Sequence, residues 1–292
     1  MKLLLKRLYK LFPFKKQLFS IVKIFWTPPH SFYKHLHFTG VFIVSIDKTN
    51  FFKINHYGFQ LENEIFWCGI RKGWETFSIS LWITLCKDAS VIIDIGANTG
   101  IYALIAKTLS PNSKVYAFEP VQRVFNKLKE NVQLNKFDIV CVKKALSNKN
   151  GSAIIYDDDS AHIYSVTVNK NMFPSDTKVI ETKIETITLN SFIKQNNISN
   201  IDLLKIDVET HEPEVLEGFS EYLAIFQPSI LIEVLNDEVG QRIADIVKGL
   251  GYLFFNIDEN HGIRQVSHIT KSDNFNYLLC NENIAKRLKL VS

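Results

Sequence analysis

From Val91 onward, short apolar runs alternate with segments long enough to form helices, and this alternation limits the fold more than any other feature. Apolar runs separated in this way predict parallel strands joined by right-handed helical crossovers, so we expect an α/β fold with a mostly parallel sheet. The last two runs follow each other without a helix-like segment, which predicts a terminal antiparallel hairpin. The expected strands are VIIDIG, KVYAFEP, DIVCVKKAL, IDLLKIDV, PSILIEVL, YLFFNID and FNYLLC.

The regular alternation lapses over residues 148–200, which predicts an insertion of extra strands and one short helix. Within it, the acidic run Asp157–Asp159 near His162 is expected to be solvated surface rather than a metal site. We expect a basic amphipathic segment at residues 1–27, a β/α extension at 28–88 and the main domain at 89–284. Four scattered cysteines without a CxxC pair favour a reducing, cytoplasmic setting.

The N-terminal segment carries the strongest charge asymmetry, because no Asp or Glu precedes Asp47. The net charge of +4 comes from this segment, so the rest of the chain offers no basic surface for nucleic acid. Residues 1–12 place Lys and Arg on one side of a helical wheel and apolar side chains on the other. We expect residues 1–16 either to contact the inner face of a membrane or to pack on their own domain. Lysines at positions 15, 16 and 23 make the apolar runs too short to span a bilayer, and we expect no secretory signal.

The stretch VIIDIGANTG leads from an apolar strand into a glycine-containing turn of the kind that holds nucleotides. A Walker loop requires Lys after its last glycine, whereas Gly100 is followed by Ile101 and Tyr102. A dinucleotide loop requires glycines two and five positions after Gly96, where this chain has Asn98 and Ile101. Ligands held through phosphate are therefore disfavoured.

A cationic ligand without phosphate fits the same residues better. Asp94 is expected at the carboxyl end of the first strand, where open α/β sheets bind ligands, and its charge suits an ammonium or sulfonium group. Gly96 and Gly100 let the backbone approach closely, and the first amides of the next helix can receive a carboxylate. Glu119, at the end of the second strand, can accept both ribose hydroxyls, although nicotinamide enzymes share that feature. Together these residues favour S-adenosylmethionine, with a ligand-free tight turn as the alternative.

Ionisable residues crowd the end of the fourth main strand, in LLKIDVETHE. We expect the first and fourth strands to be neighbours where the strand order reverses. Charges this dense beside a buried strand are costly unless they pair or form a site. Methyl transfer to a hydroxyl requires a proton acceptor, and Asp207, Glu209 and His211 are candidates, with Lys205 beside them. Asp207, Glu209 and His211 could also bind a divalent cation together. Glu212 is expected to stabilise the start of the following helix.

Four motifs in this order, DIGANTGIYALIA, VYAFEP, KALSNKNG and LLKIDVETHEPEVLEG, resemble those of the FkbM-type methyltransferases, a branch of the class I S-adenosylmethionine-dependent fold. ENEIFWCG and GWE, upstream of them, also resemble bacterial members. The resemblance implies a Rossmann-like, seven-stranded sheet, KIDVE facing the acceptor and Ser147 near the adenine. Thr210 stands where the family usually has glycine. The donor site that the resemblance implies comprises Asp94, Gly96, Asn98, Gly100 and Glu119.

The sequence thus predicts an S-adenosylmethionine-dependent O-methyltransferase. The resemblance implies a hydroxyl acceptor on a sugar or natural product, and the basic N-terminal segment suggests a sugar in a lipid-linked or surface glycan. We expect residues 148–200 and part of the N-terminal region to shape the acceptor pocket. Two alternatives remain open at this point: an NAD-type oxidoreductase, disfavoured by the missing third glycine, and a binding protein that keeps the fold without turnover.

Overall fold

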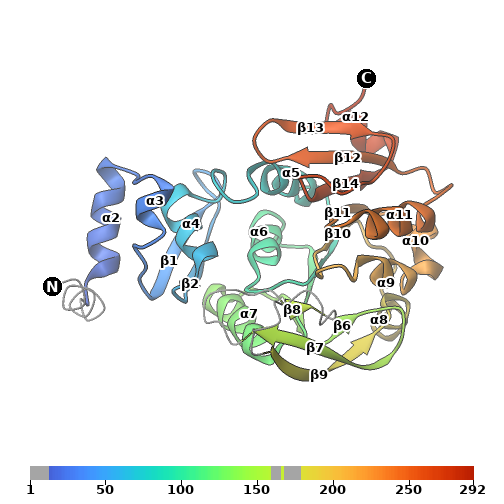
Figure 1. Ribbon diagram of the computed structural model, residues 1–292, viewed down its shortest axis with the longest axis horizontal. Coiled ribbons are helices and arrows are strands. Elements are labelled where there is room, and N and C mark those ends of the chain that lie inside the picture. Colours follow the sequence, from blue (N-terminus) through green and yellow to red (C-terminus); the bar gives the residue numbers. More distant parts are fainter. Residues whose placement is uncertain (1–12, 159–165, 168–178) are drawn as a thin grey trace.

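The central sheet of the computed structural model has the strand order β13-β12-β14-β11-β10-β3-β4-β5 (Figure 1). Its strands are β3 (Val91–Ile95), β4 (Lys114–Phe118), β5 (Val140–Val142), β10 (Leu203–Ile206), β11 (Ser229–Glu233), β12 (Leu253–Asp258), β13 (Gly262–Val266) and β14 (Asn276–Cys280). The first five are parallel, whereas β14 is antiparallel to both of its neighbours. The structure describes residues 13–158, 166–167 and 179–292.

The predicted α/β class and the mostly parallel sheet are confirmed, but the sheet has eight strands within the described residues, not seven. The additional strand, β13, pairs antiparallel with β12 at the edge of the sheet. Its exposed Arg264 and Gln265 interrupt the apolar pattern by which the other strands were recognised. The predicted antiparallel pairing of the two terminal runs is confirmed, because β12 and β14 are neighbours.

Helices cover both faces of this sheet and form two separate apolar cores. Alternate strand residues enter different cores, as Ile92 and Ile93 of β3 do. One core lies under α5 (Thr76–Cys86), α6 (Ile101–Leu109), α7 (Gln122–Asn135) and α12 (Glu282–Arg287). The other lies under α8 (Leu189–Asn196), α9 (Glu212–Glu217), α10 (Ser220–Phe226) and α11 (Asp237–Ile246). The protein therefore has three layers, with the sheet in the middle.

The order of the strands reverses between β3 and β10. From β3 the chain continues to β4 and β5 on one side, whereas from β10 it continues to β11 on the other. These two strands are parallel neighbours, as predicted, and their register places Asp94 beside Lys205. Crevices outside the carboxyl ends of strands at such a reversal are the usual ligand sites of open α/β sheets.

Three strands of the predicted insertion, together with β6 just before it, form a second, four-stranded sheet with the order β6-β9-β7-β8. Its strands are β6 (Ala145–Leu146), β7 (Gly151–Asp158), β8 (Val166–Thr167) and β9 (Val179–Ile187). The predicted strand DIVCVKKAL is divided between the two sheets, because β5 belongs to the first and β6 to the second. Ile155 and Ile184 of the insertion pack against Val121 and Val124 at the start of α7. Asp159 and His162, from the predicted solvated run, lie outside the described residues.

The N-terminal elements form a layer at one end of the molecule, beyond α6 and α7 (Figure 1). They are α2 (Lys15–Phe25), α3 (His30–Tyr33), β1 (Gly40–Ser45), β2 (Phe51–His56) and α4 (Gln60–Cys68). β1 and β2 pair antiparallel and supply β structure in the predicted β/α extension, whereas α4 was not predicted. The predicted basic helix at residues 1–12 lies outside the described residues. In the part of the chain that is described, no helix has both the length and the hydropathy needed to cross a membrane.

Asn131 links this N-terminal layer to the main domain. Its side chain is fully buried, accepts a hydrogen bond from the Asn55 backbone of β2 at 2.9 Å and donates one to the Thr99 carbonyl at 2.9 Å. Thr99 belongs to the turn after β3, so one amide connects β2, α7 and that turn. Both backbone groups depend on this side chain for those hydrogen bonds.

We expect Asn131→Leu to lower the free energy of unfolding by about 2–4 kcal/mol, because a backbone donor and a backbone acceptor lose a buried partner. Urea denaturation followed by circular dichroism would measure the change. Asn126→Leu, an exposed substitution on the same helix, is the matched control and should cost under about 0.5 kcal/mol. Equal costs for the two variants would contradict the role given to Asn131.

Candidate active site

The turn after β3 is held against the end of β10 by close backbone contact. The backbone amide of Asp207 donates to the Ile95 carbonyl at 3.1 Å, and a Cβ atom on Gly96 would lie 1.8 Å from the Asp207 carbonyl oxygen. Gly96 also has a φ of 76°, in the left-handed region. Both the available space and the backbone conformation therefore require glycine at this position. The close contact that it permits joins the predicted donor loop to the predicted acceptor strand.

Asp94 is buried at the carboxyl end of β3 and faces the predicted ligand site. Its carboxylate accepts a hydrogen bond from the Ala103 amide in the first turn of α6 at 3.0 Å. Burial raises the pKa of Asp94 to about 7, although the Lys205 ammonium lowers it. A cationic ligand would favour the ionised carboxylate in the same way that Lys205 does.

Glu119 and Asn98 lie together between the ends of β3 and β4. The Glu119 carboxylate accepts hydrogen bonds from the amides of Asn98 at 3.1 Å and Val121 at 2.9 Å. Burial nevertheless raises the pKa of Glu119 to about 7. Asn98 has a φ of 52°, and its side-chain oxygen is buried without a hydrogen-bond partner among the described residues. An unpaired buried acceptor beside a carboxylate suits a ligand that brings hydrogen-bond donors.

Gly100 begins α6 in the left-handed conformation, with a φ of 94°. A Cβ atom there would lie 2.6 Å from the Leu128 side chain of α7. The second glycine of the motif therefore permits close packing of α7 on the turn, and it does not line the cavity described below.

Lys205 is the only lysine that the structure buries at the centre of the sheet among the described strands, with 1% of its surface exposed. Its ammonium lies 3.1 Å from the Asp207 carboxylate and 5.1 Å from the centre of the Tyr102 ring. Burial alone would lower the pKa of Lys205, but Asp207, Glu75 and Glu233 together raise it above its usual range. Lys205 is thus a protonated donor that fixes Asp207, and it is poorly suited to act as a base.

Two further acids, Glu75 and Glu233, complete the group around Lys205 and were not predicted as site residues. Glu75 precedes α5 and accepts a hydrogen bond from the Tyr102 hydroxyl. Glu233 ends β11, where burial and the Asp207 charge raise its pKa. Sequence signals for both existed: Glu75 lies in the GWE motif, and Glu233 ends a strand as Asp94 and Glu119 do.

The turn from Asp207 to His211 contains two residues in the left-handed region, Glu209 at a φ of 55° and Thr210 at 80°. A β-branched residue rarely adopts such a φ, so Thr210 keeps the backbone conformation of a glycine at a cost in strain. The buried Glu212 side chain holds the turn by accepting hydrogen bonds from the Val208 amide at 3.1 Å and the Thr210 amide at 3.3 Å. Burial and the Asp207 charge raise the pKa of Glu209 to about 7.

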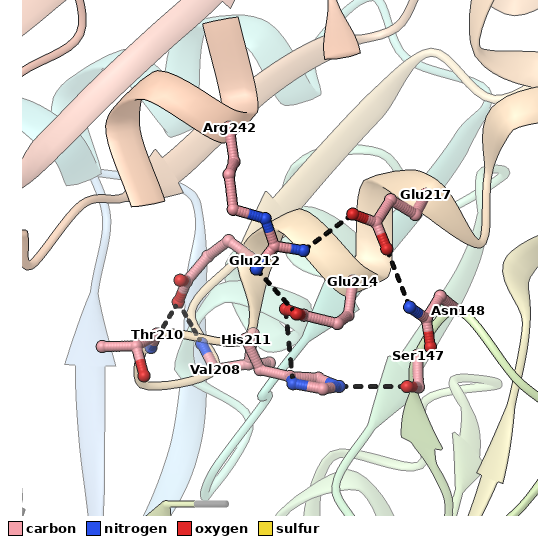
Figure 2. A network of polar contacts seen from close by, with 9 residues as sticks. All are labelled: Ser147, Asn148, Val208, Thr210, His211, Glu212, Glu214, Glu217 and Arg242. Atoms are coloured by element: carbon pink, nitrogen blue, oxygen red, sulfur yellow. Dashed lines mark hydrogen bonds and ion pairs between the residues drawn. The ribbon is translucent and has the colours of Figure 1, made fainter. Parts of the chain in front are cut away.

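His211 belongs to a network of polar contacts that connects the insertion to α9 and α11, as Figure 2 shows. Its Nε2 atom lies 3.0 Å from the Ser147 hydroxyl, and its Nδ1 atom lies 3.5 Å from the Glu214 carboxylate. Arg242 binds Glu214 at 2.8 Å and Glu217 at 2.7 Å. Because both ring nitrogens have partners and burial lowers the pKa of His211, the imidazole is better placed to position the turn than to accept a proton.

One cavity of about 300 Å³ joins the two predicted sites. From the donor loop it is lined by Asp94, Gly96, Asn98 and Glu119, and from the predicted acceptor strand by Lys205, Asp207, Glu209 and His211. Ser147 does not line this cavity; Lys144, Ala145 and Leu146 lie at its wall instead, so the predicted place of Ser147 near an adenine stays a prediction. Further lining residues are Leu61, Trp74, Glu75, Ile155, Ile184 and Glu233.

The structure does not support the predicted cation site at Asp207, Glu209 and His211. In residues 13–158, 166–167 and 179–292, no three His, Cys, Asp or Glu side chains are grouped so that they could hold a metal ion. His211 directs its nitrogens to Ser147 and Glu214, and Asp207 directs a carboxylate oxygen to Lys205.

Comparison with known proteins places the chain among methyltransferases. Residues 94–254 match the family described as the methyltransferase FkbM domain. The hexuronic acid methyltransferase AglP of Haloferax volcanii is 28% identical over 147 residues, which are 50% of this chain and 56% of that protein. The 31-O-demethyl-FK506 methyltransferase FkbM of Streptomyces tacrolimicus is 26% identical over 194 residues, 57% of this chain and 74% of that protein.

Three curated methyltransferases, AglP among them, are matched over only 56% to 60% of their own length. Among solved structures, methyltransferase FkbM from Methylobacillus flagellatus KT is similar, with a TM-score of 0.45 and 12% identity over 66% of this chain and 44% of that one.

We expect Gly96→Ala to destabilise the protein by several kcal/mol, because the new methyl group would overlap the Asp207 carbonyl and force the two strand ends apart. Gly249→Ala is the matched control, since Gly249 has a φ of 78° but no atom within 4 Å of the new methyl group. The control should cost about 1 kcal/mol from backbone conformation alone. Thermal unfolding of both variants measures the difference, and similar melting temperatures would show that the contact is unimportant.

Proposed function

This chain belongs to the methyltransferase FkbM domain family, and we propose that it transfers a methyl group from S-adenosylmethionine to a hydroxyl group of a sugar or a similarly hydroxyl-rich natural product. The observation that carries the proposal is the single cavity that contains both the donor-loop residues and the carboxylates at the ends of β10 and β11. A donor and an acceptor bound side by side in one cavity can be aligned for transfer.

The residues of the donor loop fit S-adenosylmethionine. When bound, this cofactor supplies an electrophilic methyl group on a positively charged sulfur. The buried Asp94 carboxylate would balance a positive charge, and the Glu119 carboxylate has the position to accept hydroxyl donors. The unpaired Asn98 side-chain oxygen offers a further acceptor. The cavity of about 300 Å³ admits a ligand of moderate size.

The carboxylates near Lys205 are the groups best placed to take the proton of an acceptor hydroxyl. Asp207 is held by the Lys205 ammonium at 3.1 Å, and a carboxylate anchored in this way keeps a fixed orientation. Glu209, with its pKa raised to about 7, is the second candidate. Lys205 and His211 would act as positioning residues, since one stays protonated and the other has both nitrogens engaged.

The carboxyl groups of the cavity limit which acceptors can bind there. Four carboxyl groups line its acceptor side, namely those of Glu75, Asp207, Glu209 and Glu233. Burial and the Asp207 charge raise the pKa of Glu209 and of Glu233, so further negative charge is unfavourable on this side, whereas hydroxyl and amino groups can donate hydrogen bonds to the carboxyl oxygens. The relative AglP is named for a hexuronic acid, whose carboxylate would be poorly matched here. We therefore propose a neutral or amino-bearing acceptor, which could belong to a lipid-linked or surface glycan.

We expect S-adenosylhomocysteine to bind and to release a proton at pH 6. In the ligand-free protein the pKa of Glu119 is about 7, so its carboxyl group is largely protonated at that pH, and hydroxyl donors favour the ionised form. Calorimetry in two buffers of different ionisation enthalpy measures the release, which should fade by pH 8. Glu119→Gln should bind at least about tenfold more weakly and release less proton.

The exposed Glu282→Gln is the control for this measurement and should bind like the unchanged protein. NAD tests the rival oxidoreductase hypothesis and should give no heat. Binding of NAD in place of S-adenosylhomocysteine would contradict the proposed cofactor.

We expect Asp207→Asn to lower kcat for methyl transfer at least about 100-fold, because the amide cannot accept the hydroxyl proton, while S-adenosylhomocysteine binding changes little. The assay uses labelled S-adenosylmethionine with a neutral hexoside, an amino sugar and a hexuronic acid, and the first two should be labelled preferentially. Asp245→Asn, an exposed change, should leave kcat intact. Transfer to no acceptor, with donor binding retained, would favour the alternative of a binding protein without turnover.

A further inference from the structure

Helix α2 is apolar on the side that faces the protein and on the side that faces away from it. On the inner side, Phe19 is buried and packs 5.5 Å from Trp67, while Lys23 lies over the Phe66 ring. On the outer side, Phe14, Leu18, Ile21 and Phe25 follow one another at spacings of four, three and four residues, which places them along one face of the helix. A surface helix of a globular protein normally presents polar residues on that face.

These apolar side chains are highly exposed and lie close together in the sequence. Ile21 is 57% exposed, Ile24 75% and Phe25 83%. More than half of the large, exposed apolar residues in the described chain lie between positions 14 and 32. A contiguous apolar patch of this kind marks an interaction surface. We define the outer surface of α2 as Phe14, Leu18, Ile21, Ile24, Phe25 and Trp26.

The segment that carries this surface is basic, because α2 itself contributes Lys15, Lys16 and Lys23 and the sequence contains no Asp or Glu before position 47. A symmetric contact with a second copy of the chain would bring two basic segments together. A surface that offers both anionic groups and an apolar interior would complement the lysines and the apolar side chains at once.

The position of α2 allows such a contact without covering the proposed active site. α2 is the outermost element at one end of the molecule, and β1, β2 and α4 lie between it and the main sheet (Figure 1). None of the residues of the outer surface of α2 lines the cavity.

We propose that the outer surface of α2 docks on an anionic lipid bilayer, with its apolar side chains inserted between lipid headgroups and its lysines paired with lipid phosphates. This binding site differs from the predicted contact through residues 1–16, because most of it lies in residues 18–26. It does not depend on the methyl transfer proposed above.

The experiment is sedimentation of the full chain with vesicles of phosphatidylcholine containing phosphatidylglycerol, and with vesicles of phosphatidylcholine alone. We expect binding to the anionic vesicles, weakened by salt and much lower on the neutral ones. Ile21→Glu/Phe25→Glu should weaken binding more than about tenfold, since two inserted side chains become charged. Residues 1–12 are intact in this variant, so a loss is attributable to α2.

Ile225→Glu is the matched control, because Ile225 is a 70% exposed apolar residue on α10, and it should bind like the unchanged chain. Trp26 provides a second measurement: its fluorescence should shift to the blue with anionic vesicles, and Trp26→Phe should remove that shift. Each variant should still bind S-adenosylhomocysteine, so a loss of vesicle binding can be distinguished from a failure of the proposed function. Equal vesicle binding by Ile21→Glu/Phe25→Glu, or a dimer in light scattering that this variant dissociates, would overturn the proposal.

Discussion

A buried ammonium group on the central strand is the constraint around which the proposed active site is arranged. Lys205 lies between β3 and β11, where water does not solvate its charge, and a charge in such a place is tolerated only when opposite charges surround it. The compensating acids come from separate elements: Asp94 from β3, Asp207 from the turn after β10, Glu75 from the start of α5 and Glu233 from the end of β11. Balancing one lysine therefore brings Glu75, Asp207 and Glu233 of the acceptor side together with Asp94 of the donor loop.

Sequence reasoning was most reliable where a local pattern has one physical meaning. Apolar runs separated by helix-length segments define a parallel sheet, and the ends of its strands then define where Asp94 and Glu119 must lie. The prediction that the first and fourth strands are neighbours is confirmed for the same reason. The strand count was wrong, because β13 has exposed polar residues and is recognised only by its pairing with β12.

The composition of the site was harder to predict, because it depends on contacts between distant residues. Glu75 approaches Tyr102 and Asn276 through tertiary packing that no spacing in the sequence encodes. The network at His211 likewise requires Ser147, which directly follows β6 and whose hydroxyl comes within 3.0 Å of His211 only in the folded chain. A list of ionisable residues at one strand end could name candidates for a base or a cation site, but it could not tell which nitrogen or oxygen atoms already had partners.

The residues that line the cavity come from two different parts of the chain. Residues 94–254 match the family, whereas Glu75 and the neighbouring Trp74 and Leu61, which also line the cavity, belong to the segment upstream of that match. The donor loop is thus encoded by one stretch of the chain and part of the acceptor wall by another. In the proposed reaction, replacement of the upstream segment would change part of the acceptor side of the cavity while the donor-loop residues keep their sequence.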